Sequence, residues 1–279
     1  KYHMKRSKLF LVIGITFMVL SVSMVLYPTI SNAINSFYSI STIKDYTKYS
    51  DTISATDRLS LLSVAEKYNK TLRDTVSTFS YSTDSLVDSY DDALNFEDGL
   101  IGYIEIKKIN VKLPIYHGSD PDVLKKGVAH IPNSALPTGG IGNNTVLSAH
   151  TGYPTQVFFD NLTELTVGDT INIYVLDNTL TYKITAKNIV EPDDTSLLNA
   201  DDTKDLLSLI TCYPYGVNSH RLIVTAERVI VSSTHDEAIE STKSESKNSF
   251  EIIISAIIAF STVAIIVTIA RKRRKKYAR

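Results

Sequence analysis

Residues 206–224 read LLSLITCYPYGVNSHRLIV and are the most informative part of the chain. An apolar run, 206–211, has the length of a buried strand and ends at Cys212, and a second apolar run starts at Leu222. The residues between the two runs include Pro, Gly, Asn and Ser, which favour turns. The pattern predicts two strands. If a hairpin connects them, Cys212 and Arg221 lie at the same end of a sheet.

A second strand end of this kind lies upstream. Residues 145–154 read TVLSAHTGYP, so His150 ends an apolar run and enters a turn. A thiol is mostly protonated at neutral pH, and a cysteine enzyme therefore needs a group that exchanges protons and a donor for the developing oxyanion. Cys212, His150 and Arg221 supply a nucleophile, a proton donor and a cation that binds negative charge.

Short β-rich runs separated by turn residues surround these two stretches. Pro114 lies inside one run, which indicates an edge strand or a bulge, and Asp177-Asn178 is a suitable hairpin turn between two others. No long helices alternate with the runs, so a doubly wound α/β sheet is disfavoured and a mostly β closed barrel or sandwich is expected. The expected strands are 102–106, 111–116, 145–149, 170–176, 181–190, 206–211 and 222–231.

The residues before the β-rich part have helical character. Apolar residues recur at spacings of three and four over 59–72, and Thr56 or Asp57 can cap the helix that they predict. Residues 77–98 are rich in Ser, Asp and Tyr, which predicts either an ordered surface loop or a linker. At the other end, residues 232–250 are polar and rich in Ser, as expected for a flexible stalk.

Two uncharged apolar stretches, 9–27 and 252–270, flank everything described so far. Each is long enough to cross a hydrocarbon core of roughly 30 Å as a helix. Basic residues precede the first stretch and follow the second, so the positive-inside rule places both termini in the cytoplasm and the intervening domain outside the cell. The alternatives are a cleaved signal peptide for the first stretch and a buried core helix for the second. The length of the first stretch and the basic cluster after the second argue against them.

The distribution of charge and the cysteine content disfavour some classes of function. All 30 acidic residues lie between Asp45 and Glu251, whereas 11 of the 29 Lys and Arg residues lie on the terminal sides of the two apolar stretches, in 1–8 and 271–279, which leaves an acidic external domain. Phosphate binding needs a basic face, so a nucleic-acid-binding role is disfavoured. Cys212 is the single cysteine, so no intramolecular disulfide can form. The histidines lack the spacing of metal ligands, and we expect neither a metal site nor a cofactor.

The two strand ends resemble the signature motifs of the sortases. Residues 208–222 around Cys212 resemble the nucleophile motif of that family, and residues 147–154 around His150 resemble its histidine motif. The resemblance extends over about residues 100–231. It implies a closed, sortase-type eight-stranded β-barrel preceded by a helical extension.

The same resemblance implies a two-step transpeptidation. Cys212 would attack the Thr–Gly bond of a C-terminal Leu-Pro-x-Thr-Gly-like sorting signal to form an acyl-enzyme, which an amine then resolves. His150 and Arg221 would complete the catalytic set, and Thr211 would assist the oxyanion site. The protein partners would then be substrates that carry such signals.

The layout of the chain, with two flanking membrane segments and a long N-terminal extension, is similar to that of class C sortases. These enzymes polymerise pilins, and a lid with an Asp-Pro-aromatic motif covers their active site. The nearest match is Asp88-Ser89-Tyr90, so Asp88 and Tyr90 are expected near Cys212 as a lid. The acceptor would be a lysine amine of a pilin. The expected layout is a cytoplasmic N-terminus (1–8), a membrane helix (9–30), the helical extension and lid (31–99), the catalytic barrel (100–231), the stalk (232–250), a second membrane helix (251–270) and a basic cytoplasmic tail (271–279).

Other interpretations stay open on the sequence. A housekeeping enzyme would transfer its substrate to a cell-wall peptidoglycan amine instead of a pilin. A non-catalytic, membrane-tethered β-domain that binds a surface partner would keep Cys212 as an inert core thiol. Of the rival histidines, His130 is expected to be structural, and His220 should point away from the face of Arg221 because successive strand residues alternate.

Overall fold

The computed structural model describes residues 2–76, 78–82 and 84–230. The predicted stalk, second membrane helix and basic tail, residues 232–279, lie outside the described residues.

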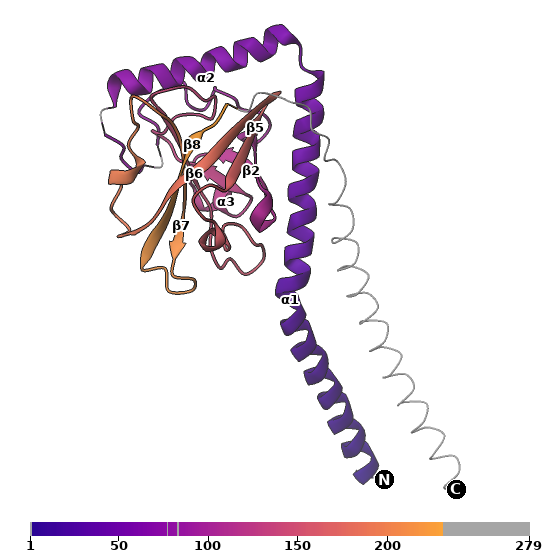
Figure 1. The fold of residues 1–279 in the computed structure, drawn as a ribbon. Coiled ribbons are helices and arrows are strands. Elements are labelled where there is room, and N and C mark those ends of the chain that lie inside the picture. Colours follow the sequence, from indigo (N-terminus) through magenta and orange to yellow (C-terminus); the bar gives the residue numbers. More distant parts are fainter. Residues whose placement is uncertain (1, 77, 83, 231–279) are drawn as a thin grey trace. The chain divides into compact units, whose positions relative to one another are not determined.

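Eight strands close into one barrel in the order β1-β2-β3-β4-β7-β8-β6-β5, which confirms the mostly β, closed-barrel fold. Figure 1 shows the strands with the long N-terminal helix beside them. β2 pairs with β3, and β4 with β7, in parallel, and all other neighbours are antiparallel. The strands are β1 (Leu100–Ile106), β2 (Val111–His117), β3 (Val128–His130), β4 (Asn143–Ser148), β5 (Thr170–Val175), β6 (Asn178–Val190), β7 (Asp205–Tyr213) and β8 (His220–Arg228). Short helices connect them: η1 (Lys107–Ile109), α3 (Pro121–Leu124), η2 (Leu162–Glu164) and η3 (Ser196–Leu198).

Three details differ from the sequence prediction. β3 was not expected, because its three residues are too few to show a periodicity. Pro114 does not lie on an edge strand, because β2 has β1 on one side and β3 on the other. The pairing with β3 starts one residue later, at Ile115, so the missing N–H of Pro114 interrupts no bond on that side. The β5–β6 turn is Leu176-Asp177, since Val175 pairs with Asn178.

Side chains alternate between the inside and the outside of the barrel. Leu147 of β4 and Leu209 of β7 belong to the central core. Val146 and Ile210, one residue away on each strand, belong to a second apolar cluster on the outer face, which Phe79 covers. This alternation shows which residues at the ends of β4 and β7 face outward.

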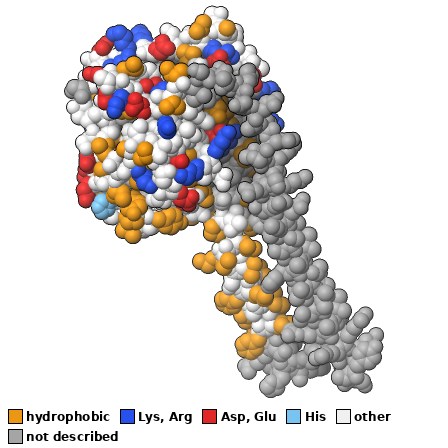
Figure 2. Space-filling model, viewed as in Figure 1, with side chains coloured by type: hydrophobic (Ala, Val, Ile, Leu, Met, Phe, Trp, Pro, Cys, Tyr) orange, Lys and Arg blue, Asp and Glu red, His pale blue; other side chains and the backbone are white. Residues whose placement is uncertain are grey.

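α1 (Tyr2–Thr52) is a single helix that starts before the barrel and packs along it. Among the described residues it is the one helix whose length and composition would let it cross a membrane, over Leu9–Thr52. Figure 2 shows exposed apolar side chains along the part of α1 that extends away from the barrel. Nearer the barrel, the buried Tyr46 hydroxyl donates to the Ile101 carbonyl (2.8 Å) and accepts from the Leu176 amide (2.8 Å).

α2 (Ala55–Thr75) confirms the helix predicted from the apolar spacing, with Ala65, Tyr68 and Leu72 buried. Its N-cap is Ser54, whose hydroxyl accepts from the Asp57 amide, and not Thr56 or Asp57. The helix begins earlier than predicted because Ser54 alone has the extended backbone of a cap.

α2 covers the end of the barrel where β4 begins. Asn69 binds the backbone of Leu136, and Arg73 binds the Asn143 side chain. His150 and Cys212 lie at the opposite end, where β4 and β7 finish.

Candidate active site

Cys212 and Arg221 are cross-strand partners at the end of β7 and the start of β8. Side chains of directly opposed residues in an antiparallel pair lie on the same face and within reach of each other. Cys212 lies two residues from Ile210 on β7, and Arg221 lies two residues from Ile223 on β8. Because residues two apart on a strand face the same side, both point outward like these members of the outer cluster. Cys212 is a half-buried free thiol.

His150 reaches the same face through a different pairing. β4 runs parallel to β7 with Ser148 opposite Ile210, and the Ala149 amide donates to the Ile210 carbonyl (3.2 Å). Continuing this register by two residues puts His150 beside Cys212 on a strand neighbour about 4.8 Å away. The structure therefore brings together the three residues that the sequence singled out, from positions 150, 212 and 221.

Aromatic rings surround the His150 imidazole. Tyr153 stacks on it (ring centroids 5.1 Å apart, 4° between planes), and Phe158 meets it edge-on at 6.3 Å. Burial lowers the pKa of His150, and the negative charge of Asp160 opposes this by raising the pKa. No hydrogen bond joins the ring to Cys212 Sγ within the described residues.

Asp160 is a site residue that the sequence analysis missed. Its two carboxylate oxygens accept from the backbone amides of Gly152 and Phe158, both at 2.9 Å. The His150 carbonyl accepts from the Phe159 amide (3.0 Å) and closes the base of the same loop, residues 150–160. Asp160 thus fixes the loop and also places a negative charge near the imidazole. The available signal was a lone Asp ten residues after His150.

Thr211 does not face the substrate side. It precedes Cys212 on β7 and so points the other way, where it is buried. Its hydroxyl donates to the Ala149 carbonyl and bonds to the Thr151 hydroxyl, both at 2.8 Å. The Thr211 side chain therefore links β7 to the loop that follows His150, and assistance to the oxyanion site stays a prediction.

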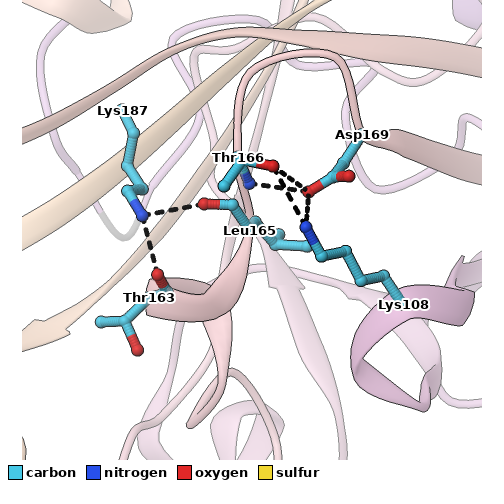
Figure 3. Close-up of polar contacts among 6 residues, drawn as sticks. All are labelled: Lys108, Thr163, Leu165, Thr166, Asp169 and Lys187. Carbon is cyan, nitrogen blue, oxygen red and sulfur yellow. Dashed lines mark hydrogen bonds and ion pairs between the residues drawn. The ribbon is translucent and has the colours of Figure 1, made fainter.

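Side chains of the barrel also bind the segment that follows the loop 150–160 (Figure 3). Lys187 of β6 donates to the carbonyls of Thr163 (2.7 Å) and Leu165 (2.8 Å). Lys108 forms an ion pair with Asp169 at 2.7 Å, which holds the pKa of that carboxyl below its ordinary value. These contacts tie the chain between His150 and β5 to the barrel wall.

Arg221 Nη1 donates to the carbonyls of His220 (2.9 Å) and Asn218 (3.2 Å), which orients the guanidinium across the turn before β8. Its Nε and Nη2 have no protein partner among the described residues, so donors remain for a ligand. His220 is paired with Tyr213 and therefore lies on the other face, where its ring approaches Glu191 at 3.4 Å.

The two residues of the predicted lid differ in burial, since Asp88 is exposed and Tyr90 is not. Tyr90 is buried in the central core. Its hydroxyl donates to the His130 carbonyl (3.0 Å), accepts from the Gly118 amide (3.0 Å) and lies 2.9 Å from His130 Nδ1. Tyr90 therefore plugs the inside of the barrel, whereas Cys212 points outward. A ring of this size gains more free energy in the core than in an exposed position, so Tyr90 is not an exposed lid residue, and a lid over Cys212 stays a prediction.

The arrangement suits acyl transfer. It has a thiol, an imidazole and a guanidinium on one outer face, beside the apolar cluster that contains Val146 and Ile210. Among the described residues, no group of His, Cys, Asp and Glu side chains is placed to hold a metal ion.

Comparisons with known proteins agree with this geometry. A family model described as "Sortase domain" matches residues 104–229. Sortase D from Bacillus subtilis is 37% identical over 131 residues, which cover 46% of this chain and 63% of that protein, so the match spans less than two thirds of this relative.

Two solved structures match over nearly their whole length. Sortase A from Corynebacterium diphtheriae, a lid mutant, has a TM-score of 0.59 and 41% identity over 64% of this chain and 96% of that chain. Clostridium perfringens sortase C with the C-terminal cell wall sorting motif has a TM-score of 0.62 and 38% identity over 69% and 100%.

Proposed function

Because this chain belongs to the sortase family, we propose that it is a cysteine transpeptidase with Cys212 as nucleophile, His150 as proton donor and Arg221 as the cation that binds developing negative charge. One observation carries the assignment of roles. The parallel β4–β7 pairing and the antiparallel β7–β8 pairing give these three residues adjacent positions on one outer face.

In the first step, the Cys212 thiolate attacks the threonine carbonyl carbon of a Leu-Pro-x-Thr-Gly-like sorting signal. The C–N bond to glycine breaks, and the His150 imidazolium gives its proton to the departing amine nitrogen. The free N–H donors of Arg221 stabilise the charge on the carbonyl oxygen. The product is a thioester at Cys212.

In the second step, a neutral amine attacks the thioester carbon and the C–S bond breaks. The amine loses a proton to His150, which restores the thiolate and imidazolium for another cycle. The rings of Tyr153 and Phe158 shield the imidazole from water and hold its plane during both transfers.

We propose a lysine of a pilin subunit as the acceptor. This rests on the likeness to the class C sortase of Clostridium perfringens, whose structure was determined with a C-terminal cell wall sorting motif. A cell-wall peptidoglycan amine is the second candidate. It is favoured by the burial of Tyr90 inside the barrel, because a class C lid would lie over Cys212.

We propose that the chain is a membrane protein with an external catalytic domain at about residues 100–231. The apolar part of α1 supports an N-terminal anchor. The uncharged stretch 252–270, with six basic residues directly after it, supports a second membrane segment and cytoplasmic termini.

The test is to trap the acyl-enzyme. The full chain in detergent is incubated with a sorting-signal peptide and analysed by mass spectrometry. We expect an adduct at Cys212 that Cys212→Ala abolishes, and a strong loss of product release in His150→Gln. His220→Gln is the matched control, since its ring lies on the other face, and it should retain activity. Cleavage by Cys212→Ala would refute the enzyme mechanism. A product joined only to peptidoglycan would select the second acceptor.

A further inference from the structure

α1 also contacts the loop that carries His150. The Asn32 side-chain oxygen accepts from the Val157 amide (2.9 Å), and Asn35 Nδ2 donates to the Thr155 carbonyl (3.0 Å). Between these two residues, Gln156 Nε2 donates to the Ser39 hydroxyl (3.0 Å). Three consecutive residues of the loop, 155–157, are therefore each bound by one α1 side chain.

Residues 155–157 depend on α1 for their hydrogen bonds. Elsewhere in the loop, Asp160 binds the amides of Gly152 and Phe158, and Thr151 bonds to Thr211 of β7. Among the described residues, the three bonds to α1 are the only hydrogen bonds that residues 155–157 make. The central one is buried, with Gln156 and Ser39 each about 5% exposed or less. Burial makes the loss of either partner costly.

Phe158 connects these hydrogen bonds to the His150 imidazole. Phe158 follows Val157 in the chain, is fully buried, and contacts both His150 and Tyr153 edge-on. A shift of residues 155–157 would therefore move the ring that supports His150. Small displacements of a catalytic group reduce the rate strongly, because the group must lie in line with the reacting bond.

We propose that Asn32, Asn35 and Ser39 of α1 are positioning residues of the active site, which hold His150 in place by fixing residues 155–157. The proposal rests on the proposed function, since it takes His150 as the proton donor. It makes the N-terminal helix part of the catalytic apparatus as well as a candidate anchor. Asn32 lies five residues after Tyr27, the end of the uncharged stretch, so helix rise separates the two by only about 7.5 Å.

The two asparagines permit a sharp test, because they use opposite chemistry. Asn32 accepts a hydrogen bond, and Asn32→Asp keeps an acceptor oxygen for the Val157 amide. Asn35 donates, and Asn35→Asp removes the donor and sets a carboxylate against the Thr155 carbonyl. The two variants add the same charge one helical turn apart. A difference between them therefore reports the hydrogen bond and not the charge.

The full chain in detergent is used for all variants, with the exposed Thr29→Ala and Lys44→Ala as controls on the same helix. We expect Asn35→Asp and Ser39→Ala to speed hydrogen exchange in the segment 150–160 and to lower kcat/KM for a sorting-signal peptide about five- to tenfold. Asn32→Asp and both controls should stay near the wild type. Asn32→Ala, which lacks the acceptor, should behave like Asn35→Asp.

A titration of His150 by NMR gives a readout that does not require activity. Tyr153 stacks on the ring and Asp160 is the charged group that acts on its pKa, while Cys212 and Arg221 are paired on the same outer face. Burial lowers the pKa of His150, so a loosened loop in Asn35→Asp should raise that pKa toward its ordinary value relative to Asn32→Asp.

Equal exchange and equal titration in Asn32→Asp and Asn35→Asp would overturn the positioning role. A wild-type chain that cleaves no sorting signal would refute the proposed function instead, while the exchange and titration data would still decide whether α1 positions His150.

Discussion

Replacing Asp160 with Asn should impair the site through the His150 loop without touching any of the three groups assigned to catalysis. The carboxylate accepts from the amides of Gly152 and Phe158 at 2.9 Å each. Asn has one acceptor oxygen, so one amide would face an NH2 group and lose its partner.

The magnitude follows from those two bonds. A hydrogen bond to a charged group contributes roughly 1.5–3 kcal/mol, and the partial exposure of Asp160 puts the loss at the low end, about 1–2 kcal/mol. If the loop must be ordered for proton transfer, kcat/KM should fall about five- to thirtyfold.

The substitution also has a signature in pH dependence. Burial lowers the pKa of His150 and the Asp160 charge raises it, so removing the charge leaves burial unopposed and the pKa falls further. The imidazolium is then lost at lower pH. The alkaline limb of the kcat/KM profile should therefore move to lower pH, because the proposed role of His150 is that of an acid.

The assay is peptide cleavage by the full chain across pH 5 to 9, with a thermal melt of each variant. Glu164→Gln is the matched control, because this exposed carboxylate lies four residues further along and its removal should change neither limb. An Asp160→Asn variant with wild-type kcat/KM and an unmoved alkaline limb would refute the reasoning.

Three further predictions concern the fold. Gly102→Ala would place a Cβ 2.2 Å from the Tyr174 carbonyl oxygen across the β1–β5 pair, so the free energy of unfolding in urea should drop by about 3 kcal/mol; a drop below about 1 kcal/mol would contradict this. Burial lowers the pKa of His130 to about 3, so its contribution to stability is complete above pH 6.5 and is lost as the pH falls. Unfolding free energy should be about 2 kcal/mol smaller at pH 5 than at pH 7 from this residue alone, and His130→Asn should flatten that dependence. Tyr90→Phe should destabilise the barrel by about 1–3 kcal/mol yet leave the rate of Cys212 alkylation unchanged; faster alkylation would restore the lid hypothesis.

Local patterns in the chain predicted much of this architecture. Strand-length apolar runs that end at His150 and Cys212 placed both residues at strand termini, and the turn after Cys212 implied the hairpin that returns Arg221. The spacing of apolar residues and the residue preferences of turns depend on only a few neighbouring residues, so a single sequence is enough to predict strands and turns from them. β3 escaped prediction because three residues carry no period.

The site needed information of longer range. Asp160 gained its role from two amide partners, and the burial of Tyr90 could not be predicted from its neighbours because a hydrophobic core can take up a large ring from any part of the chain. The Asn32 and Asn35 contacts join residues more than a hundred positions apart. Apolar runs and turn residues thus predicted where Cys212, His150 and Arg221 lie along the strands, and the resemblance to the sortases implied their roles. Packing specified what surrounds and holds them, because those contacts depend on the closure of the whole barrel and not on any neighbouring sequence.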